Sequence, residues 1–156
     1  MLRIKASPAP SSTHGLGLYA GQDIYEGQVI WQYHPSFDQV MSKRKFINLC
    51  RALDDDALEH VLSCSYKRNN KYYYLTDNTR FINHDEINFN LVMLDDMTEV
   101  ALRDIRVGEE LLENYFTSYD EDDFFTFELR NVSMHEYLDL YLPARRPHAQ
   151  NQHLSG

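Results

Sequence analysis

The segment that decides the fold of this chain reads Arg80-Phe81-Ile82-Asn83-His84. Two strongly polar residues, Asn83 and His84, directly follow an apolar, strand-like pair, and this arrangement is not typical of ordinary core packing. Two further segments stand out in the same way. Residues 15–20 read Gly-Leu-Gly-Leu-Tyr-Ala, and residues 108–115 read Gly-Glu-Glu-Leu-Leu-Glu-Asn-Tyr. We therefore expect functional residues in these three segments.

In this order, the three segments resemble the signature motifs of the SET-domain protein-lysine methyltransferases: a GxGxxA-type opening, an (R)FINHS-type core and a GEEL…Y ending. The resemblance runs across residues 14–116, most of the chain. It implies a β-rich α+β fold of small curved sheets, with peripheral helices and a C-terminal pseudoknot. Threading of this kind is rare among folds, so sequence periodicity alone does not predict it. The resemblance also implies methyl transfer from S-adenosylmethionine to the side-chain amine of a lysine.

The length of 156 residues indicates one domain. We expect residues 1–142 to form the SET domain with a C-terminal helical segment, and the polar residues 143–156 to form a disordered tail. No apolar run approaches the ~20 residues that span a membrane, and the N-terminus lacks the apolar core of a signal peptide. The sequence therefore predicts an intracellular protein, cytoplasmic or nuclear, with no membrane partner.

Cysteine usage argues against a metal centre. Cys50 and Cys64 are the two cysteines of the chain, and a structural zinc cluster needs more ligands at tighter spacing. Both are expected to be buried free thiols. The chain then resembles a compact version of the family without the zinc-binding cysteine clusters that often flank the domain.

The charge of the chain points to a basic partner. The formal net charge is −9, and residues 107–129 contain eight acids but no lysine or arginine. Such a surface repels DNA and RNA and attracts a basic peptide. A plainer alternative is that residues 120–123 only solubilise the start of a helix, where acids suit the helix dipole. Charge patterning does not choose between the two readings.

Hydrophobic periodicity and turn residues predict a series of short elements. Short strands are expected at residues 2–6, 16–20, 28–33 and 72–75, with a loop at 7–15 and a basic turn at 67–71. A hairpin is expected from residues 89–94 and 99–102. Helices are expected from about 36 to 52, after an Asp54–Asp56 cap, and between 124 and 142.

The resemblance assigns the cofactor to two parts of the chain. The glycine-containing loop would contact S-adenosylmethionine mainly through main-chain groups, and the two later motifs would supply side chains and further backbone contacts. Asn83 would bond the amino-acid end of the cofactor, and His84 would contact the adenine. The expected cofactor-binding residues are His14, Gly15, Leu16, Gly17, Leu18, Arg80, Asn83, His84 and Tyr115.

Catalysis in this family depends on orientation, because the sulfonium methyl and a neutral amine must be held close and collinear. Tyr115 matches the family's catalytic tyrosine, and Tyr33 is a second catalytic candidate that also lines the lysine channel. Glu113 and Tyr74 are further channel candidates. Other aromatic residues could contribute, although core packing is the usual role for such side chains: Trp31, Tyr72 and Tyr73.

The chain departs from the family pattern at three places. The core motif continues without the usual Ser-Cys-x-Pro-Asn, and either Asn88 or Asn90 would supply its closing asparagine. Glu113 stands where the family commonly has Phe or Tyr, so its carboxylate would either bond the lysine amine or face solvent. With no cysteine-rich closing segment, the aromatic run at residues 124–127 would pack over the cofactor instead.

Two other functions are compatible with the sequence. The chain could be a SET-like module that has lost catalysis and binds basic peptides. It could also be a methyltransferase whose substrate is neither a histone nor histone-like.

Overall fold

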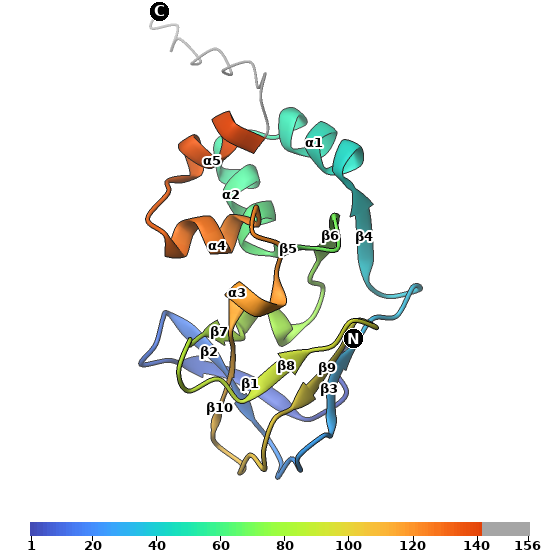
Figure 1. The fold of residues 1–156 in the computed structure, drawn as a ribbon, viewed down its shortest axis with the longest axis vertical. Coiled ribbons are helices and arrows are strands. Elements are labelled where there is room, and N and C mark those ends of the chain that lie inside the picture. Colours follow the sequence, from blue (N-terminus) through green and yellow to red (C-terminus); the bar gives the residue numbers. More distant parts are fainter. Residues whose placement is uncertain (142–156) are drawn as a thin grey trace, which may run out of the picture.

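The computed structural model describes residues 1–141, which form two sheets and a group of helices. In Figure 1 the larger sheet lies at one end and most helices lie at the other. The larger sheet has seven strands: β1 (Ala6–Pro10), β2 (Leu16–Ala20), β10 (Glu110–Glu113), β8 (Leu91–Met93), β9 (Thr98–Ala101) and β3 (Val29–Gln32) in spatial order, with β7 (Asn83–His84) also pairing with β10. The smaller sheet has the order β4 (Gln39–Ser42), β6 (Lys71–Tyr74) and β5 (Ser65–Arg68).

Within the larger sheet, strand β10 pairs with strands from distant parts of the sequence. It pairs antiparallel with β2 and parallel with both β7 and β8. The late strand is therefore inserted between the N-terminal hairpin and the core segment, as a C-terminal pseudoknot requires. Leu18, Ile30, Leu91 and Leu111 are almost completely buried beneath this sheet. The predicted β-rich α+β architecture is confirmed.

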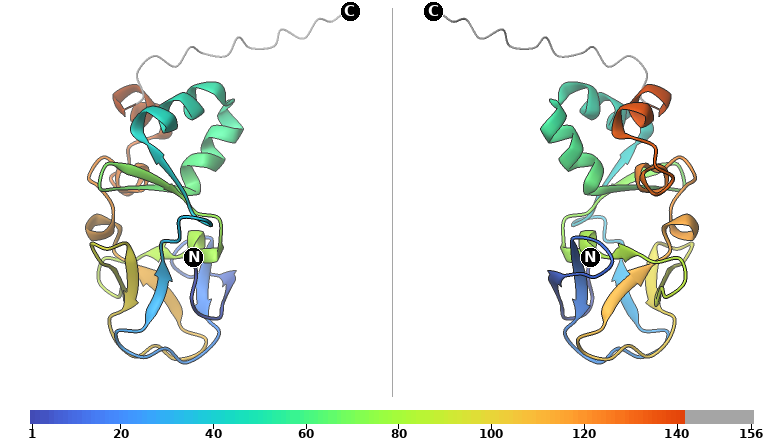
Figure 2. Two further views of the ribbon diagram at one scale, coloured as in Figure 1. Left: turned by 90° about the vertical axis from the view of Figure 1, so that its right-hand side faces the viewer. Right: turned by 90° about the vertical axis from the view of Figure 1, so that its left-hand side faces the viewer.

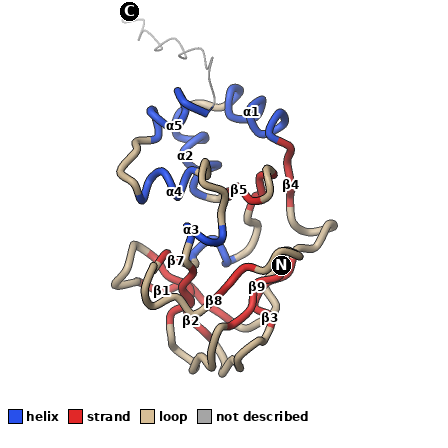
Figure 3. The backbone as a smooth tube through the Cα atoms, in the orientation of Figure 1, coloured by secondary structure: helices blue, strands red, loops and turns tan. Residues whose placement is uncertain are grey.

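The helices build a second apolar core away from the larger sheet, as the two side views show (Figure 2). Phe46 and Tyr72 stack with ring centroids 3.9 Å apart, and Leu58, Leu62 and Tyr137 complete the centre of the cluster. The helical elements are α1 (Lys43–Ala52), α2 (Asp55–Ser63), the single-turn η1 (Asn78–Phe81), α3 (Tyr115–Ser118), α4 (Phe124–Leu129) and α5 (Met134–Tyr141). Figure 3 shows α3 lying between the two ends of the molecule.

The helix predicted from about residue 36 begins only at Lys43. Residues Gln39–Ser42 form strand β4, which pairs residue for residue with β6. Ser42 is the N-cap of this helix, and its hydroxyl accepts a hydrogen bond from Lys45 N at 3.3 Å. The prediction was wrong because helical spacing does not reveal a strand partner 30 residues away.

Two strand predictions need correction in the same way. The first strand lies at Ala6–Pro10 rather than at residues 2–6, and it occupies the edge of the sheet, where prolines are tolerated. The basic turn predicted at 67–71 is confirmed at Asn69 and Asn70, with φ of 51° and 59°, but the residues on either side of it belong to strands β5 and β6. Asparagine is one of the residues that accept this conformation.

The remaining predictions agree with the structure where it describes them. A strand at 16–20, a strand within 28–33 and a strand that overlaps 72–75 are present. The hairpin of β8 and β9, the Asp54-capped helix and the late helices are present as well. Cys50 and Cys64 are both buried. Within residues 1–141 no helix is long and apolar enough to cross a membrane. The predicted tail at 143–156 lies outside the described residues.

Candidate functional site

A cleft of about 890 Å³ separates the N-terminal hairpin and core segment from the late helices. Loop residues 14–16, Arg80, Asn83, His84 and Tyr115 all line it. The structure thus brings together most of the residues that the resemblance assigned to the cofactor, although they are far apart in sequence. Gly17 and Leu18 do not line the cleft: they are buried in β2, and Leu18 belongs to the sheet core.

The side chain of Asn83 fixes the loop at the cleft wall. Its amide Nδ2 donates to the carbonyl oxygens of His14 at 2.9 Å and Leu16 at 3.1 Å, and to Glu110 Oε1 at 3.0 Å. Gly15 turns this loop with φ of 47°, in the region that favours glycine. Asn83 is therefore a positioning residue for the loop as well as a wall of the cleft.

Gly17 has a structural role that the sequence did not suggest. A Cβ atom at this position would lie 2.0 Å from Glu110 Oε1. The glycine thus makes room for the Glu110 carboxylate, which also accepts a hydrogen bond from the Tyr19 hydroxyl at 3.2 Å. Glu110 was missed as a site residue, although it lies in the quoted Gly108-Glu109-Glu110 segment.

His84 and Tyr115 are held against each other at the end of β10. The backbone N–H of Tyr115 donates to His84 Nδ1, and the two rings lie with centroids 5.2 Å apart. Burial lowers the pKa of His84, which keeps the imidazole neutral near pH 7. The Tyr115 hydroxyl donates to the carbonyl oxygen of Ile82. Burial and the nearby Glu113 carboxylate raise the pKa of Tyr115 well above its usual value, so the hydroxyl stays protonated.

Asn90, rather than Asn88, ties the core segment to β10. Asn90 Nδ2 donates to the Glu110 carbonyl at 2.8 Å, and Leu112 N donates to Asn90 Oδ1 at 2.9 Å. Asn90 is almost fully buried, whereas Asn88 is exposed and its side-chain amide donates to Asp85 Oδ2 at 3.1 Å. Of the two candidates for the closing asparagine, Asn90 is therefore the one that contacts β10.

Helices α4 and α5 supply the far wall of the cleft. Phe124, Phe125 and Leu129 from α4 and Met134 from α5 line it. Phe127 points elsewhere and packs edge-on against Tyr137. Of the aromatic run, Phe124 and Phe125 therefore line the cleft and Phe127 does not.

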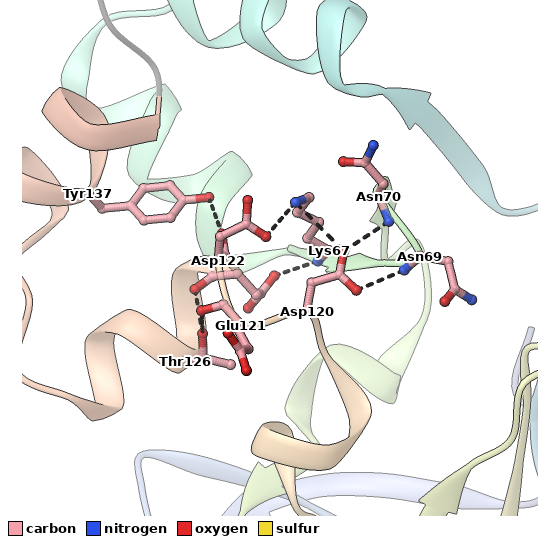
Figure 4. A network of polar contacts seen from close by, with 9 residues as sticks. Lys67, Asn69, Asn70, Asp120, Glu121, Asp122, Thr126 and Tyr137 are labelled. Carbon is pink, nitrogen blue, oxygen red and sulfur yellow. Dashed lines mark hydrogen bonds and ion pairs between the residues drawn. The ribbon is translucent and has the colours of Figure 1, made fainter.

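Most acids of the run at residues 120–123 take part in a network of ion pairs and hydrogen bonds within the protein (Figure 4). Lys67, 4% exposed, forms ion pairs with Asp120 and Asp122. Asp120 also accepts hydrogen bonds from the backbone N–H groups of Asn69 and Asn70, both at 2.9 Å. The interpretation of an acidic surface with no cation to offset it was wrong, because the cation comes from a strand about 55 residues earlier.

Asp123 completes this network from a buried position. Its carboxylate accepts hydrogen bonds from Lys67 N and from Phe125 N, and the latter bond caps α4. Burial raises the pKa of Asp123 to about 7. The β5–β6 hairpin thus anchors the segment that carries the far wall of the cleft.

A second, much smaller cavity of about 20 Å³ lies beside Ile82, and we call it the acid chamber. Glu113 lines it and is only 3% exposed, so the alternative in which this carboxylate faces solvent is wrong. Tyr33 does not line the acid chamber but packs edge-on against Tyr73, with centroids 6.0 Å apart. Tyr74 points away, with its hydroxyl 3.4 Å from His60 Nε2 on α2. The structure therefore brings Glu113, but neither Tyr33 nor Tyr74, to this cavity.

Comparisons with known proteins match the motif-bearing part of the chain. The family model described as SET domain matches residues 15–116. A search of the curated proteins finds no match.

Solved structures of Polycomb Repressive Complex 2 from Chaetomium thermophilum are similar in fold. A ctPRC2 structure in an autoinhibited conformation bound to S-adenosylmethionine is 21% identical with a TM-score of 0.55, covering 84% of this chain and 17% of that chain. A humanized mutant of the Chaetomium thermophilum complex, bound to an inhibitor, is 21% identical with a TM-score of 0.52, covering 74% and 15%. This chain therefore spans about a sixth of the length of those chains, and the likeness concerns the fold.

Proposed function

The chain belongs to the SET-domain family, and from this premise we propose that it transfers a methyl group from S-adenosylmethionine to the side-chain amine of a lysine in a basic protein or peptide. One observation carries the proposal: a single cleft gathers loop 14–16, Asn83, His84 and Tyr115. Each of these comes from one of the three motifs. These segments are far apart in the sequence, and they come close together in space because β10 pairs with both β2 and β7.

The cleft suits a ligand of the size and polarity of S-adenosylmethionine. Its volume falls within the ~300–1,000 Å³ of small-molecule sites, and Phe124 and Phe125 give it apolar surface. Within the described chain the side chain of Asn83 forms hydrogen bonds only through Nδ2, which leaves its Oδ1 to accept from the ammonium group of the cofactor. When bound, S-adenosylmethionine supplies a methyl group on a positively charged sulfur.

Tyr115 is the residue we assign to orienting the reaction. It lines the cleft, while its hydroxyl reaches the carbonyl of Ile82, which lines the acid chamber. The neutral hydroxyl and the carbonyl oxygen can accept from the N–H groups of the lysine amine and the C–H groups of the transferred methyl group. A fixed pair of acceptors holds these ends in line, and orientation is a large part of the barrier for this type of reaction.

A basic partner is supported by the overall charge of −9. The run at 120–123 contributes less than its composition suggests, because Lys67 neutralises part of it. Glu128, which lines the cleft, and the exposed Glu121 remain available. We further propose that α4 and α5 belong to the same domain as the sheets, since their side chains complete the cleft wall.

The test is transfer of isotopically labelled methyl groups. The protein is incubated with labelled S-adenosylmethionine and with histones or a mixture of cellular proteins, and labelled residues are identified by mass spectrometry. We expect label on lysine side chains with wild type and very little with Tyr115→Phe. Cofactor and peptide binding without any transfer would instead favour the alternative of a non-catalytic module that binds basic peptides.

A further inference from the structure

The acid chamber contains polar atoms that no described residue satisfies. They are Trp31 Nε1, the Tyr66 hydroxyl, Glu99 Oε1 and Glu113 Oε1, and each residue is at most 3% exposed. Buried polar groups in folded proteins are nearly always hydrogen-bonded, and leaving one unpaired costs about 1–3 kcal/mol. Four such atoms around one cavity therefore point to a polar guest. The volume of about 20 Å³ accommodates a group the size of one water molecule or one ammonium.

Three of these atoms, the two carboxyl oxygens and the Tyr66 hydroxyl oxygen, can accept a hydrogen bond and favour a guest with N–H donors and positive charge, whereas Trp31 Nε1 is a donor and does not bond such a guest. Two of the four unsatisfied atoms are carboxyl oxygens, from Glu99 on β9 and Glu113 on β10. The other oxygen of Glu113 accepts from the Tyr119 hydroxyl at 3.0 Å. Arg68, on β5, is the nearby cation, but its guanidinium donates to the carbonyl oxygens of Ser118 and Met93. The remaining titratable groups that act on the pair are Tyr66 on β5, Tyr115 on α3 and Asp77 ahead of η1.

The two carboxyl groups have different proton affinities. Burial, the Glu113 charge and Asp77 raise the pKa of Glu99 well above its usual value. Burial also raises the pKa of Glu113, but hydrogen bonds from the Ser118 and Tyr119 side chains and the Arg68 charge oppose this rise. Two carboxyl groups in one apolar site cannot both ionise at low cost, so ionisation of one raises the pKa of the other. The hydrogen bonds and the cation around Glu113 make it the member of the pair that ionises first.

The acid chamber lies next to the reacting centre that the proposed function requires. Ile82 lines the chamber, and its carbonyl oxygen accepts the hydrogen bond of the Tyr115 hydroxyl. Tyr115 itself lines the large cleft. A lysine nitrogen in the chamber would therefore have the Ile82–Tyr115 pair between itself and the cleft.

We propose that Glu113, with Glu99 as its proton-holding neighbour, accepts a proton from the substrate's ammonium group in the acid chamber. An N–H bond of the ammonium breaks, an O–H bond forms on the Glu113 carboxylate, and the nitrogen keeps the electron pair. One ammonium and one carboxylate become one neutral amine and one carboxylic acid, which an apolar chamber favours over the separated charges. This inference rests on the proposed function, and it adds a general base that the family motifs do not include.

A first experiment observes the carboxyl groups without any reaction. The glutamate carboxyl carbons are labelled with ¹³C and followed by NMR as pH rises, in wild type, Glu99→Gln and Glu113→Gln. We expect two wild-type signals to titrate well above the ordinary glutamate pKa of about 4.3, each absent from one variant. Titration of both residues near 4 overturns the proposal, whether or not the protein is a methyltransferase.

A second experiment separates proton transfer from a structural role. Glu113→Gln keeps the shape of the side chain, and S-adenosylmethionine affinity serves as the check that the variant is folded. We expect kcat/KM for a lysine peptide to fall about 100-fold at pH 7, in the range of general-base effects. The deficit should shrink toward pH 10, because free lysine deprotonates with a pKa of about 10.4.

Matched variants make the outcome decisive. Glu26→Gln changes an exposed carboxylate and should leave the pH profile unchanged. A Glu113→Gln deficit that is equal at all pH values, or no deficit, overturns the base assignment. If Glu113→Gln does not fold, Glu99→Gln is read in the same way, since loss of its proton-holding neighbour should also change the pH profile. Absence of methyl transfer by the wild type would contradict the proposed function. The NMR titration would then still test whether the pKa values of Glu99 and Glu113 are raised.

Discussion

The backbone N–H of Tyr115 donates a hydrogen bond to Nδ1 of His84 at 3.1 Å, across 31 residues of sequence. Because Nδ1 acts as the acceptor, the ring proton of a neutral His84 lies on Nε2. The bond links the core segment to the start of α3. It therefore places the proposed catalytic tyrosine relative to the residues proposed to bind the cofactor.

Replacing Asn83 with alanine should weaken the binding of S-adenosylmethionine. The change removes a charge-assisted hydrogen bond worth about 1.5–3 kcal/mol, and it also frees loop 14–16, which Nδ2 holds. Calorimetry should show an affinity at least ten times lower. Asn88→Ala, at an exposed position, is the matched control and should bind as wild type does. Equal affinity in both variants would remove Asn83 from the site.

Tyr115→Phe should lower turnover about 100-fold or more while leaving cofactor affinity nearly unchanged. Only the hydroxyl is deleted, and one well-placed catalytic hydrogen bond commonly contributes this much to the rate. The phenylalanine keeps the backbone bond to His84 and the ring contacts. Tyr25→Phe, at a side chain that is 65% exposed, is the control. Wild-type turnover in Tyr115→Phe would show that another residue orients the reaction.

Gly17→Ala should weaken cofactor binding although Gly17 does not line the cleft. The new Cβ would meet Glu110 Oε1, and the displaced carboxylate would leave Asn83 and Tyr19. Loss of these bonds should cost about 1 kcal/mol of cofactor binding energy. A double-mutant cycle with Glu110→Ala checks the mechanism, because the two effects should be strongly non-additive. Additive effects would mean that Gly17 acts through some other contact.

Lys67→Met should destabilise the fold by about 1–3 kcal/mol, since it leaves the half-buried Asp120 and Asp122 carboxylates without their cation. Lys71→Met, at an exposed position of the same hairpin, should change stability much less. Urea denaturation measures both. Similar denaturation midpoints for the two variants would contradict the assigned role of the network.

Asp123 should make the stability of the protein depend on pH in the direction opposite to that of an ordinary ion-paired acid. Its folded pKa of about 7 lies above the unfolded value of about 3.9. The folded state therefore binds more protons between these values. The stabilising contribution is complete below pH 4 and is lost as pH rises through 7.

Asp123→Asn tests this linkage. The difference in unfolding free energy between wild type and Asp123→Asn should fall as pH rises from 4 to 8, by up to about 4 kcal/mol. Glu121→Gln, an exposed neighbour, should show no such trend. A constant difference between wild type and Asp123→Asn would place the Asp123 pKa near its unfolded value.

Motifs predicted the fold and most of the cleft because they report local requirements. A polar pair after an apolar pair, and a glycine beside a cofactor loop, are visible in a few consecutive residues. Loop 14–16, Asn83, His84 and Tyr115 were identified because these local motifs, taken together, resemble those of a known family, and the structure places them in one cleft.

Features that depend on distant partners were not predictable. Ser42 caps a helix only because the preceding residues pair with β6, and no local pattern reveals that pairing. Lys67 neutralises acids that follow it by more than 50 residues. Glu99 was overlooked because a single acid in a hairpin strand is ordinarily solvent-exposed, and only the sheet topology buries it beside Glu113.

The insertion of β10 has a consequence for the order of folding. Tyr19 and Glu110 meet across 91 residues, and contacts of such long range form slowly because the intervening chain must first be ordered. Neither the loop held by Asn83 nor the position of Tyr115 exists until this strand has docked. A nucleotide-like ligand of the cleft would consequently bind only the completed fold and would stabilise it by mass action. The rate at which the refolding protein gains the ability to bind this ligand would therefore measure the rate at which β10 docks.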